Sequence, residues 1–167
     1  IAPFCAAVKG RSCEIPALLA LNGLRVSEIR GLDWKNVNLA TDTILVRGAV
    51  VKGVEGDVEK RTNKNATSTR TVPILIPQLH DALTAVKDKT GKVVNLAQCS
   101  ILDDVKRACQ RAKVTTCTTH DLRRSFASLC FYLGIPAKQI QLWGGWSNEA
   151  VLNKIYIKIL TKCYGHT

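Results

Sequence analysis

The sequence predicts a single α+β domain, mostly α-helical with one small antiparallel β-sheet, over residues 1–167. Three observations support this fold class. Apolar residues recur at helical spacing over most of the chain. Runs rich in β-branched residues are confined to residues 34–76. The chain has no internal repeat or low-complexity linker, and its 167 residues suit one domain with its own core.

Two short helices are expected within residues 14–31 (EIPALLALNGLRVSEIRG). The apolar residues there follow helical spacing, but Asn22-Gly23 interrupts the pattern, and this pair favours a turn. Arg25 would then stand at the start of the second helix. Free backbone N–H groups at that position also favour the binding of anions.

The sheet is expected within residues 34–76, where TILVRGAVV and RTVPILI are β-branched runs. A polar loop rich in Lys, Asn, Thr and Ser separates the two runs. The pattern predicts antiparallel strands with a mobile hairpin, and Lys64 lies in its loop.

Helical spacing returns at residues 77–88 and 98–112, and Thr119 is a suitable N-cap for the next helix, which Gly134 and Pro136 would end. The apolar stripe expected for the helix at 98–112 consists of Ile101, Leu102, Val105, Ala108, Cys109 and Ala112. The buried face expected for the following helix consists of Leu122, Phe126, Leu129, Cys130 and Leu133.

The last part of the chain predicts two further helices around a glycine turn. A short helix is expected over residues 136–143, followed by the turn at Gly144-Gly145. Ser147 would then cap a helix over about residues 148–157.

The composition favours a polyanionic partner. Lys and Arg number 24 against 13 acidic residues, which gives a net charge of +11 and a pI near 9.6. Basic residues neutralise phosphates and release condensed counterions, so nucleic acid is the expected partner. No run of about 18 apolar residues and no signal peptide is present, so we expect no membrane span and a cytoplasmic location.

The cysteines indicate free thiols in a reducing compartment. Their number, seven, is odd, and no two have the spacing of a metal knuckle. No cluster of carboxylates suited to Mg²⁺ is evident either, so we expect neither a metal nor another cofactor.

The segment from His120 to Tyr156 (HDLRRSFASLCFYLGIPAKQIQLWGGWSNEAVLNKIY) contains most of the candidate site. His120 and Arg123 stand three residues apart at a helix start, so both could bind one phosphate. The planar arginine fork donates two hydrogen bonds to paired phosphate oxygens and keeps its charge. Trp146 offers an indole N–H as a further donor, and Tyr156 offers a phenol as a nucleophile. With Arg25 and Lys64, these groups are what a metal-free attack on a phosphodiester requires.

This segment and LNGLRVSEIRGLDW around Arg25 resemble the catalytic domain of the tyrosine recombinases, the phage integrase family. The resemblance covers about residues 14–157, with THDLRRSFASLCFYLGI similar to box II and Arg25 matching the box I arginine. It implies the tyrosine recombinase catalytic-domain fold. Most relatives carry Gly-His-Ser where this chain has Gly145-Trp146-Ser147.

The resemblance also implies roles for single residues. Tyr156 would form a 3′-phosphotyrosine bond, and Lys64, in the hairpin, would protonate the departing 5′-oxygen. Glu28 would support the site from behind Arg25. Tyr132 and Tyr164 compete with Tyr156 for the nucleophile. Lys52 and Lys60 compete with Lys64, Arg124 is the alternative to Arg123, Arg30 is expected on the surface, and Trp143 in the core.

The implied function is site-specific DNA recombination by an integrase of a phage or mobile element, bacterial or phage-encoded and acting on the nucleoid. The family's usual N-terminal core-binding domain is missing from the chain, so we expect an isolated catalytic domain. The expected partners are double-stranded DNA and further copies of the chain, as a monomer alone and a tetramer on DNA. DNA-bending or directionality factors are also possible partners. The alternatives are a type IB topoisomerase and a catalytically silent DNA-binding regulator.

Overall fold

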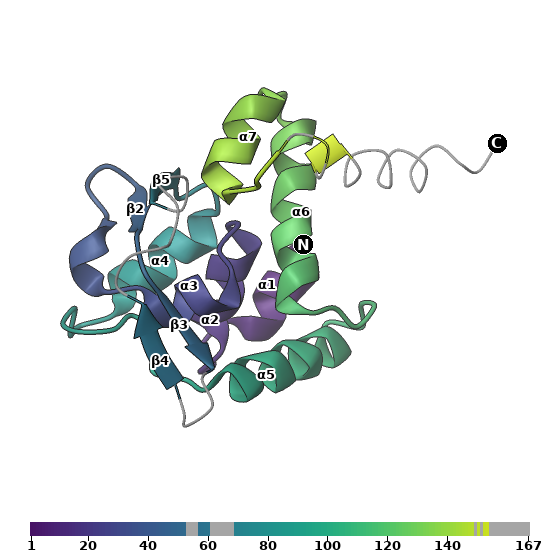
Figure 1. The fold of residues 1–167 in the computed structure, drawn as a ribbon. Helices are drawn as coiled ribbons and strands as arrows, with labels where there is room; N and C mark the ends of the chain where they lie inside the picture. Colours follow the sequence, from purple (N-terminus) through teal and green to yellow (C-terminus); the bar gives the residue numbers. More distant parts are fainter. Residues whose placement is uncertain (53–56, 61–68, 149, 151, 154–167) are drawn as a thin grey trace.

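The computed structural model describes residues 1–52, 57–60, 69–148, 150, 152 and 153 (Figure 1). Helices predominate in this part of the chain, and the strands are short. The helices are α1 Ala2–Val8, α2 Glu14–Leu21, α3 Val26–Gly31, the 3₁₀ helix η1 Trp34–Asn36, α4 Pro77–Ala85, α5 Gln98–Arg111, α6 Thr119–Tyr132 and α7 Ala137–Gly144. The strands are β1 Val37–Asn38, β2 Thr43–Val46, β3 Ala49–Lys52, β4 Asp57–Lys60 and β5 Arg70–Pro73.

Helix α2 lies at the centre of the fold, between α6, α4 and α5 (Figure 1). Its sequence, EIPALLAL, is apolar almost all round, and every residue from Pro16 to Leu21 is buried. A helix that is apolar on all faces must be enclosed by other elements. The expected break at Asn22-Gly23 is confirmed, because α2 ends at Leu21 and α3 begins at Val26.

The strands form two small antiparallel sheets where one was expected. One sheet has the order β1-β2-β5, with Ile44 opposite Val72, and the other pairs β3 with β4. Strand β3 is not part of the first sheet and packs on α3. The contact is close, because a Cβ added to Gly31 would lie 2.9 Å from the backbone of Ala49. Glycine at this position therefore permits the second sheet.

Two details of α6 differ from the expectation. Its N-cap is Thr118, one residue before Thr119, because Asp121 completes a capping box with Thr118. The Thr118 Oγ1 accepts from the Asp121 N–H at 3.2 Å, and the Asp121 carboxylate accepts from the Thr118 N–H at 2.9 Å. Leu133 was expected in the buried face but is 57% exposed, since the helix ends before it and Gly134 turns the chain with φ 73°.

The other helical expectations are largely confirmed. In α5 the buried stripe consists of Ile101, Val105, Ala108 and Cys109, whereas Leu102 and Ala112 are only half-buried. Helix α1 was not predicted, because it is only seven residues long, too short to show a helical period. Its Phe4, Cys5 and Val8 are buried, and the helix packs against α5.

Gly23 allows α6 to approach the turn between α2 and α3. Its φ is +95°, and a Cβ there would lie 2.8 Å from the ring of Phe126, a fully buried residue of α6. The carbonyl of Gly23 also accepts a hydrogen bond from Arg123 at 2.7 Å. The turn that precedes Arg25 is thus fixed against α6 at a glycine.

We expect Gly23→Ala to lower the free energy of unfolding by about 3 kcal/mol, from overpacking and a strained φ together. Gly10→Ala is the matched control, since Gly10 also has a positive φ (+71°) but nothing within 4 Å of an added Cβ. It should cost about 1 kcal/mol, from strain alone. Urea unfolding measures both, and equal losses in the two variants would contradict the packing argument.

Candidate active site

Arg25 lies at the start of α3, as expected, and is its N-cap residue. Its Nη1 donates to Glu28 Oε1 at 2.9 Å and its Nη2 donates to the Gly145 carbonyl at 2.6 Å. The Arg25 backbone N–H donates to Glu28 Oε2 at 2.8 Å. The side chain is 44% exposed, so it is anchored yet accessible to a ligand from solvent.

Glu28 lies behind Arg25, in the expected supporting position, and is only 4% exposed. Arg70 donates to its two oxygens, Nη1 to Oε1 at 2.8 Å and Nη2 to Oε2 at 2.9 Å. Burial raises the pKa of the Glu28 carboxyl, but the hydrogen bonds and charge of Arg70, aided by Arg25, outweigh it and hold this pKa below its usual value. Glu28 is therefore an ionised anchor for cations and is unsuited to act as an acid.

Arg123 projects from α6 into the interior and is only 2% exposed. Its Nη1 donates to the Gly23 carbonyl and its Nη2 to the Gly144 carbonyl, at 2.7 and 2.5 Å. Burial, followed by the positive charge of Arg25, lowers the pKa of Arg123 to about 9. The guanidinium is still charged at neutral pH. Because burial removes the solvation of this charge, a bound anion would stabilise it.

His120 stands one turn earlier on α6, with an exposed side chain. Partial desolvation and the positive charges of Arg124, Arg123 and Arg25 lower the pKa of His120. At neutral pH the imidazole is therefore mainly uncharged and able to accept a proton. The two residues expected to share one helix face thus differ in burial, since Arg123 points inward while His120 remains open.

The glycine turn after α7 places Trp146 over Arg123, with the ring centroid 4.5 Å from the guanidinium carbon. The indole is 9% exposed and packs with Phe126 and other residues of α6 and α7. Gly144 has no room for a side chain, because a Cβ would lie 1.8 Å from the Trp146 ring, and Gly145 has φ 64°. The expected turn is confirmed, and the ring–guanidinium contact is a cation–π interaction.

Two of the candidates, Lys64 and Tyr156, lie outside the described residues. The competing Tyr164 lies outside them too, whereas Tyr132 ends α6 with its side chain 88% exposed. The structure therefore places Arg25, Glu28, His120, Arg123 and Trp146 relative to one another, and the lysine and tyrosine assignments remain predictions.

Two arginines lie in environments that were not expected from the sequence. Arg30, expected on the surface, is 9% exposed and pairs with Asp57 of β4, its Nη1 at 3.2 Å and its Nη2 also in contact. Arg70 was not singled out, yet it is 8% exposed and is the main partner of Glu28. A signal was available, because period two along RTVPILI puts Arg70 on the same inward face as buried Val72. A charge on that face predicts a buried ion pair.

The cluster can bind an anion. Three guanidinium groups, of Arg25, Arg70 and Arg123, share the buried carboxylate of Glu28. The cluster therefore has an excess of positive charge beside the exposed face of Arg25 and the imidazole of His120. A phosphate placed there would gain charge-assisted hydrogen bonds from a preorganised set of donors.

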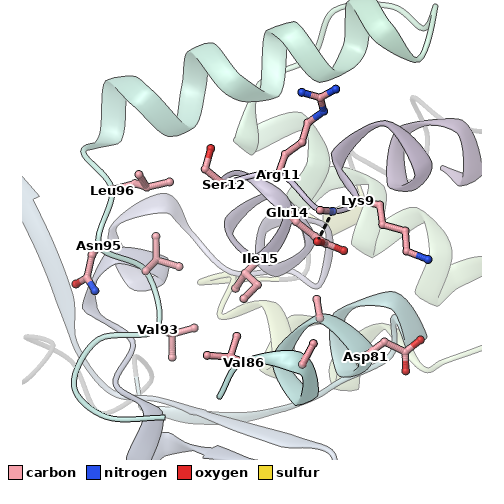
Figure 2. Close-up of a pocket in the computed structure, with 14 residues that line it drawn as sticks. Lys9, Arg11, Ser12, Glu14, Ile15, Asp81, Val86, Val93, Asn95 and Leu96 are labelled. Atoms are coloured by element: carbon pink, nitrogen blue, oxygen red, sulfur yellow. Dashed lines mark hydrogen bonds between the residues drawn. The ribbon is translucent and has the colours of Figure 1, made fainter. Parts of the chain in front are cut away.

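A hollow of about 630 Å³ lies at the opposite end of α2 from Arg25, lined by parts of α2, α4 and residues 93–96 (Figure 2). Its walls include Ile15, Val86 and Leu96, and Glu14 at its edge accepts a hydrogen bond from the Gly10 N–H at 2.7 Å. None of the candidate site residues lines it. The cluster of Arg25, Arg70, Arg123 and Glu28 is therefore separate from this mainly apolar hollow.

Within the described residues, no group of three or more His, Cys, Asp or Glu side chains is placed to hold a metal ion. In that same part of the chain, no helix has the length and apolar character needed to cross a membrane. The six cysteines described there are free thiols, and four of them are buried: Cys5, Cys13, Cys109 and Cys130.

Comparison with known proteins agrees with the fold. The sequence model of the phage integrase family matches residues 11–162. A tyrosine recombinase XerC-like protein of Caldanaerobacter subterraneus subsp. tengcongensis is 27% identical over 188 residues, covering 93% of this chain and 48% of that protein. The chain thus spans about half the length of this curated relative.

Three solved structures share the fold. The Tn1549 transposon integrase in complex with transposon right end DNA has a TM-score of 0.74 at 18% identity, over 97% of this chain and 63% of that chain. XerA recombinase has a TM-score of 0.71 at 18% identity, over 98% and 61%. The catalytic domain of bacteriophage HP1 integrase has a TM-score of 0.62 at 19% identity, over 98% and 89%. These matches confirm the fold class expected from the sequence.

Proposed function

Because the chain belongs to the phage integrase family, we propose that it catalyses site-specific recombination of double-stranded DNA through a 3′-phosphotyrosine intermediate. The observation that carries the proposal is the convergence of Arg25, Arg123 and Trp146 at one glycine turn, with His120 one helical turn before Arg123 on α6. These residues come from opposite ends of the sequence, and Arg25 binds a carbonyl 120 residues away. Two guanidinium cations with an imidazole and an indole beside them suit a phosphodiester.

In the proposed reaction the Tyr156 oxygen attacks the scissile phosphorus in line and the bond to the 5′-oxygen breaks. Lys64 donates a proton to the departing 5′-oxygen, and His120, whose lowered pKa keeps it neutral, takes the tyrosine proton. A 5′-hydroxyl of a partner strand then attacks the phosphotyrosine and restores the backbone. The covalent link conserves the bond energy, so the scheme requires neither ATP nor a divalent metal.

Arg25 and Arg123 offset the charge that grows on the non-bridging oxygens in the transition state. Trp146 packs on the guanidinium of Arg123 and offers its indole N–H as another donor. Unlike histidine, an indole cannot shuttle a proton. Acid–base work therefore falls to His120 and Lys64.

The partners in this proposal are double-stranded DNA and three further copies of the chain, assembled as a tetramer on DNA. The net charge of +11 supports a strongly salt-dependent affinity for DNA. DNA-bending or directionality factors could join this assembly. The place of action would be the nucleoid, in the cytoplasm.

The test traps the covalent intermediate. Full-length protein is incubated in EDTA with nicked suicide duplexes made from DNA flanking its gene, and a denaturing gel reports the adduct. Mass spectrometry of the digested adduct identifies the modified tyrosine. We expect an adduct on Tyr156 and none with Tyr156→Phe.

An adduct on Tyr132 or Tyr164 would refute the assignment of the nucleophile. DNA binding without any adduct would favour a silent DNA-binding regulator. Relaxation of plasmids without strand exchange between two duplexes would favour a type IB topoisomerase. Strand exchange by the parent protein supports recombination.

A further inference from the structure

Arg70, the first residue of β5, joins two parts of the candidate site that are far apart in sequence. Its two Nη atoms donate to the two oxygens of Glu28 on α3, and its Nε donates to the Trp143 carbonyl of α7 at 2.7 Å. All three contacts are charge-assisted, because the donor is a guanidinium, and the side chain is 8% exposed. Such a fork fixes both groups in distance and direction.

On the α3 side, the contact of Arg70 reaches Arg25 through Glu28. The carboxylate oxygen Oε1 accepts from both Arg70 and Arg25, at 2.8 and 2.9 Å. Oε2 accepts from Arg70 and from the Arg25 backbone N–H, at 2.9 and 2.8 Å. Because Glu28 is gripped on both oxygens, its orientation, and hence that of Arg25, depends on Arg70.

On the α7 side, Arg70 fixes the glycine turn. The Trp143 carbonyl that it binds immediately precedes Gly144 and Gly145, whose carbonyls accept from Arg123 and Arg25. The guanidinium also lies against Gly145, where an added Cβ would be 3.0 Å from its carbon atom. The same side chain thus sets the carbonyls that orient both candidate phosphate-binding arginines.

Arg70 also determines how the buried carboxylate of Glu28 is shared. Arg123 Nη1 lies 3.9 Å from Glu28, beyond hydrogen-bond distance, while Arg70 takes a bidentate position. Without Arg70, the buried Glu28 carboxylate would be left to Arg25 and Arg123 alone. Those two arginines would then be drawn toward the carboxylate and away from a bound phosphate.

We propose that Arg70 is a positioning residue for the cleavage reaction, holding Arg25 through Glu28 and the turn before Trp146 through the Trp143 carbonyl. The inference rests on the proposed function and adds a residue to it. The Arg70 side chain is 8% exposed, and each of its three nitrogens donates to Glu28 or to Trp143, so we assign it to holding these groups and not to contacting the phosphate. Its effect on the reaction is therefore exerted through Arg25 and Arg123.

The experiment compares a charged with an uncharged scissile group. This comparison distinguishes a loss of positioning from a loss of folded protein. Suicide duplexes are made with a normal phosphodiester or with a methylphosphonate at the scissile position, which replaces one charged non-bridging oxygen by a methyl group. A methylphosphonate has one negative charge fewer than a phosphodiester, in the ground state and in the transition state, so its cleavage depends less on Arg25. Misplacement of Arg25 should therefore lower the rate of adduct formation much less on this substrate, whereas partial unfolding slows both reactions equally.

Arg70→Met should lower the rate of adduct formation about 100-fold on the phosphodiester and less than about fivefold on the methylphosphonate, by analogy with the loss of one transition-state donor. Arg25→Ala should show the same dependence on the substrate. The double variant should be little worse than Arg25→Ala alone, because residues that act as a unit are not additive. Arg70→Lys, which keeps the charge, should restore part of the rate.

The matched control is Arg30→Met. Arg30 is another buried arginine, which pairs with Asp57 and donates to the Leu96 carbonyl at 3.3 Å. It has no hydrogen bond or ion pair with Arg25, Glu28, His120, Arg123 or Trp146. Any loss it causes should be equal on the two substrates. If Arg70→Met lowers the rate of adduct formation equally on the two substrates, Arg70 is not a positioning residue. The same holds if its full effect adds to that of Arg25→Ala.

The proposed function can fail separately. No adduct with the parent protein on either substrate would reject the function itself. An equal loss for Arg25→Ala on the two substrates would reject the role of Arg25, and with it the route by which Arg70 acts. If Arg70→Met does not fold, Arg70→Lys supplies the same comparison, because it retains a cation beside Glu28.

Discussion

Arg123→Ala should lower the rate of covalent adduct formation about a thousandfold, while the affinity for DNA changes less than about fivefold. The guanidinium is already oriented by the carbonyls of Gly23 and Gly144 and by the Trp146 ring. Its charge is therefore available to the transition state without reorganisation. Ground-state binding depends on many basic side chains, so the loss of one of them matters little.

The neighbour Arg124 is the matched control for this prediction. It occupies the next position on α6, is about half exposed, and lies 3.6 Å from Asp121. Arg124→Ala removes the same charge and should leave the rate of adduct formation within about threefold. Single-turnover rates and DNA titrations at one salt concentration provide the comparison. If Arg123→Ala weakens DNA binding as much as cleavage, its role is misassigned.

Lys64→Ala should slow adduct formation on ordinary DNA by about 10²–10⁴-fold, the usual contribution of a general acid. A duplex with a 5′-thiolate leaving group needs no proton at that atom. The variant should therefore cleave this substrate at nearly the rate of the parent protein. The two leaving groups compared in one single-turnover assay isolate proton donation from every other effect of the substitution.

Lys52→Ala and Lys60→Ala are the controls for Lys64, since both residues competed for the same role. They should cleave ordinary DNA at close to the parent rate. A slow reaction of Lys64→Ala on the thiolate duplex would show that Lys64 does not supply the proton. If Lys60→Ala were the variant that is slow on ordinary DNA and rescued by the thiolate duplex, Lys60 would be the proton donor.

The sequence predicted those parts of the fold and site that depend on local order. The strongly periodic helices α5 and α6 appeared close to their expected bounds, and the pair Asn22-Gly23 located the turn that puts Arg25 at the start of α3. Local chemistry also explains the small error at Thr118. Both threonines can cap a helix, and only the position of Asp121 selects the first.

The charged interior could not be predicted in the same way. Arg70 and Glu28 are 42 residues apart, and Arg30 and Asp57 are 27 apart. The strand period marks Arg70 as inward-facing, but the carboxylate that pairs with it is brought to it only by the completed fold. Arg30 was expected at the surface because its partner Asp57 is likewise distant in the sequence. The position of β3 outside the first sheet likewise depends on its close contact with Gly31 of α3.

The unequal sharing of Glu28 by three guanidinium groups has a consequence for how the protein can vary. Burying cations that lack a full set of counterions costs folding free energy, so the domain is less stable than its packing alone would allow. Arg70 is hydrogen-bonded to both oxygens of Glu28, whereas Arg123 lies 3.9 Å from it. A neutral substitution at Arg123 could therefore be recovered in a screen for heat resistance, and it would be an inactive variant. Selection for thermostability and selection for recombination should thus favour different residues at this position.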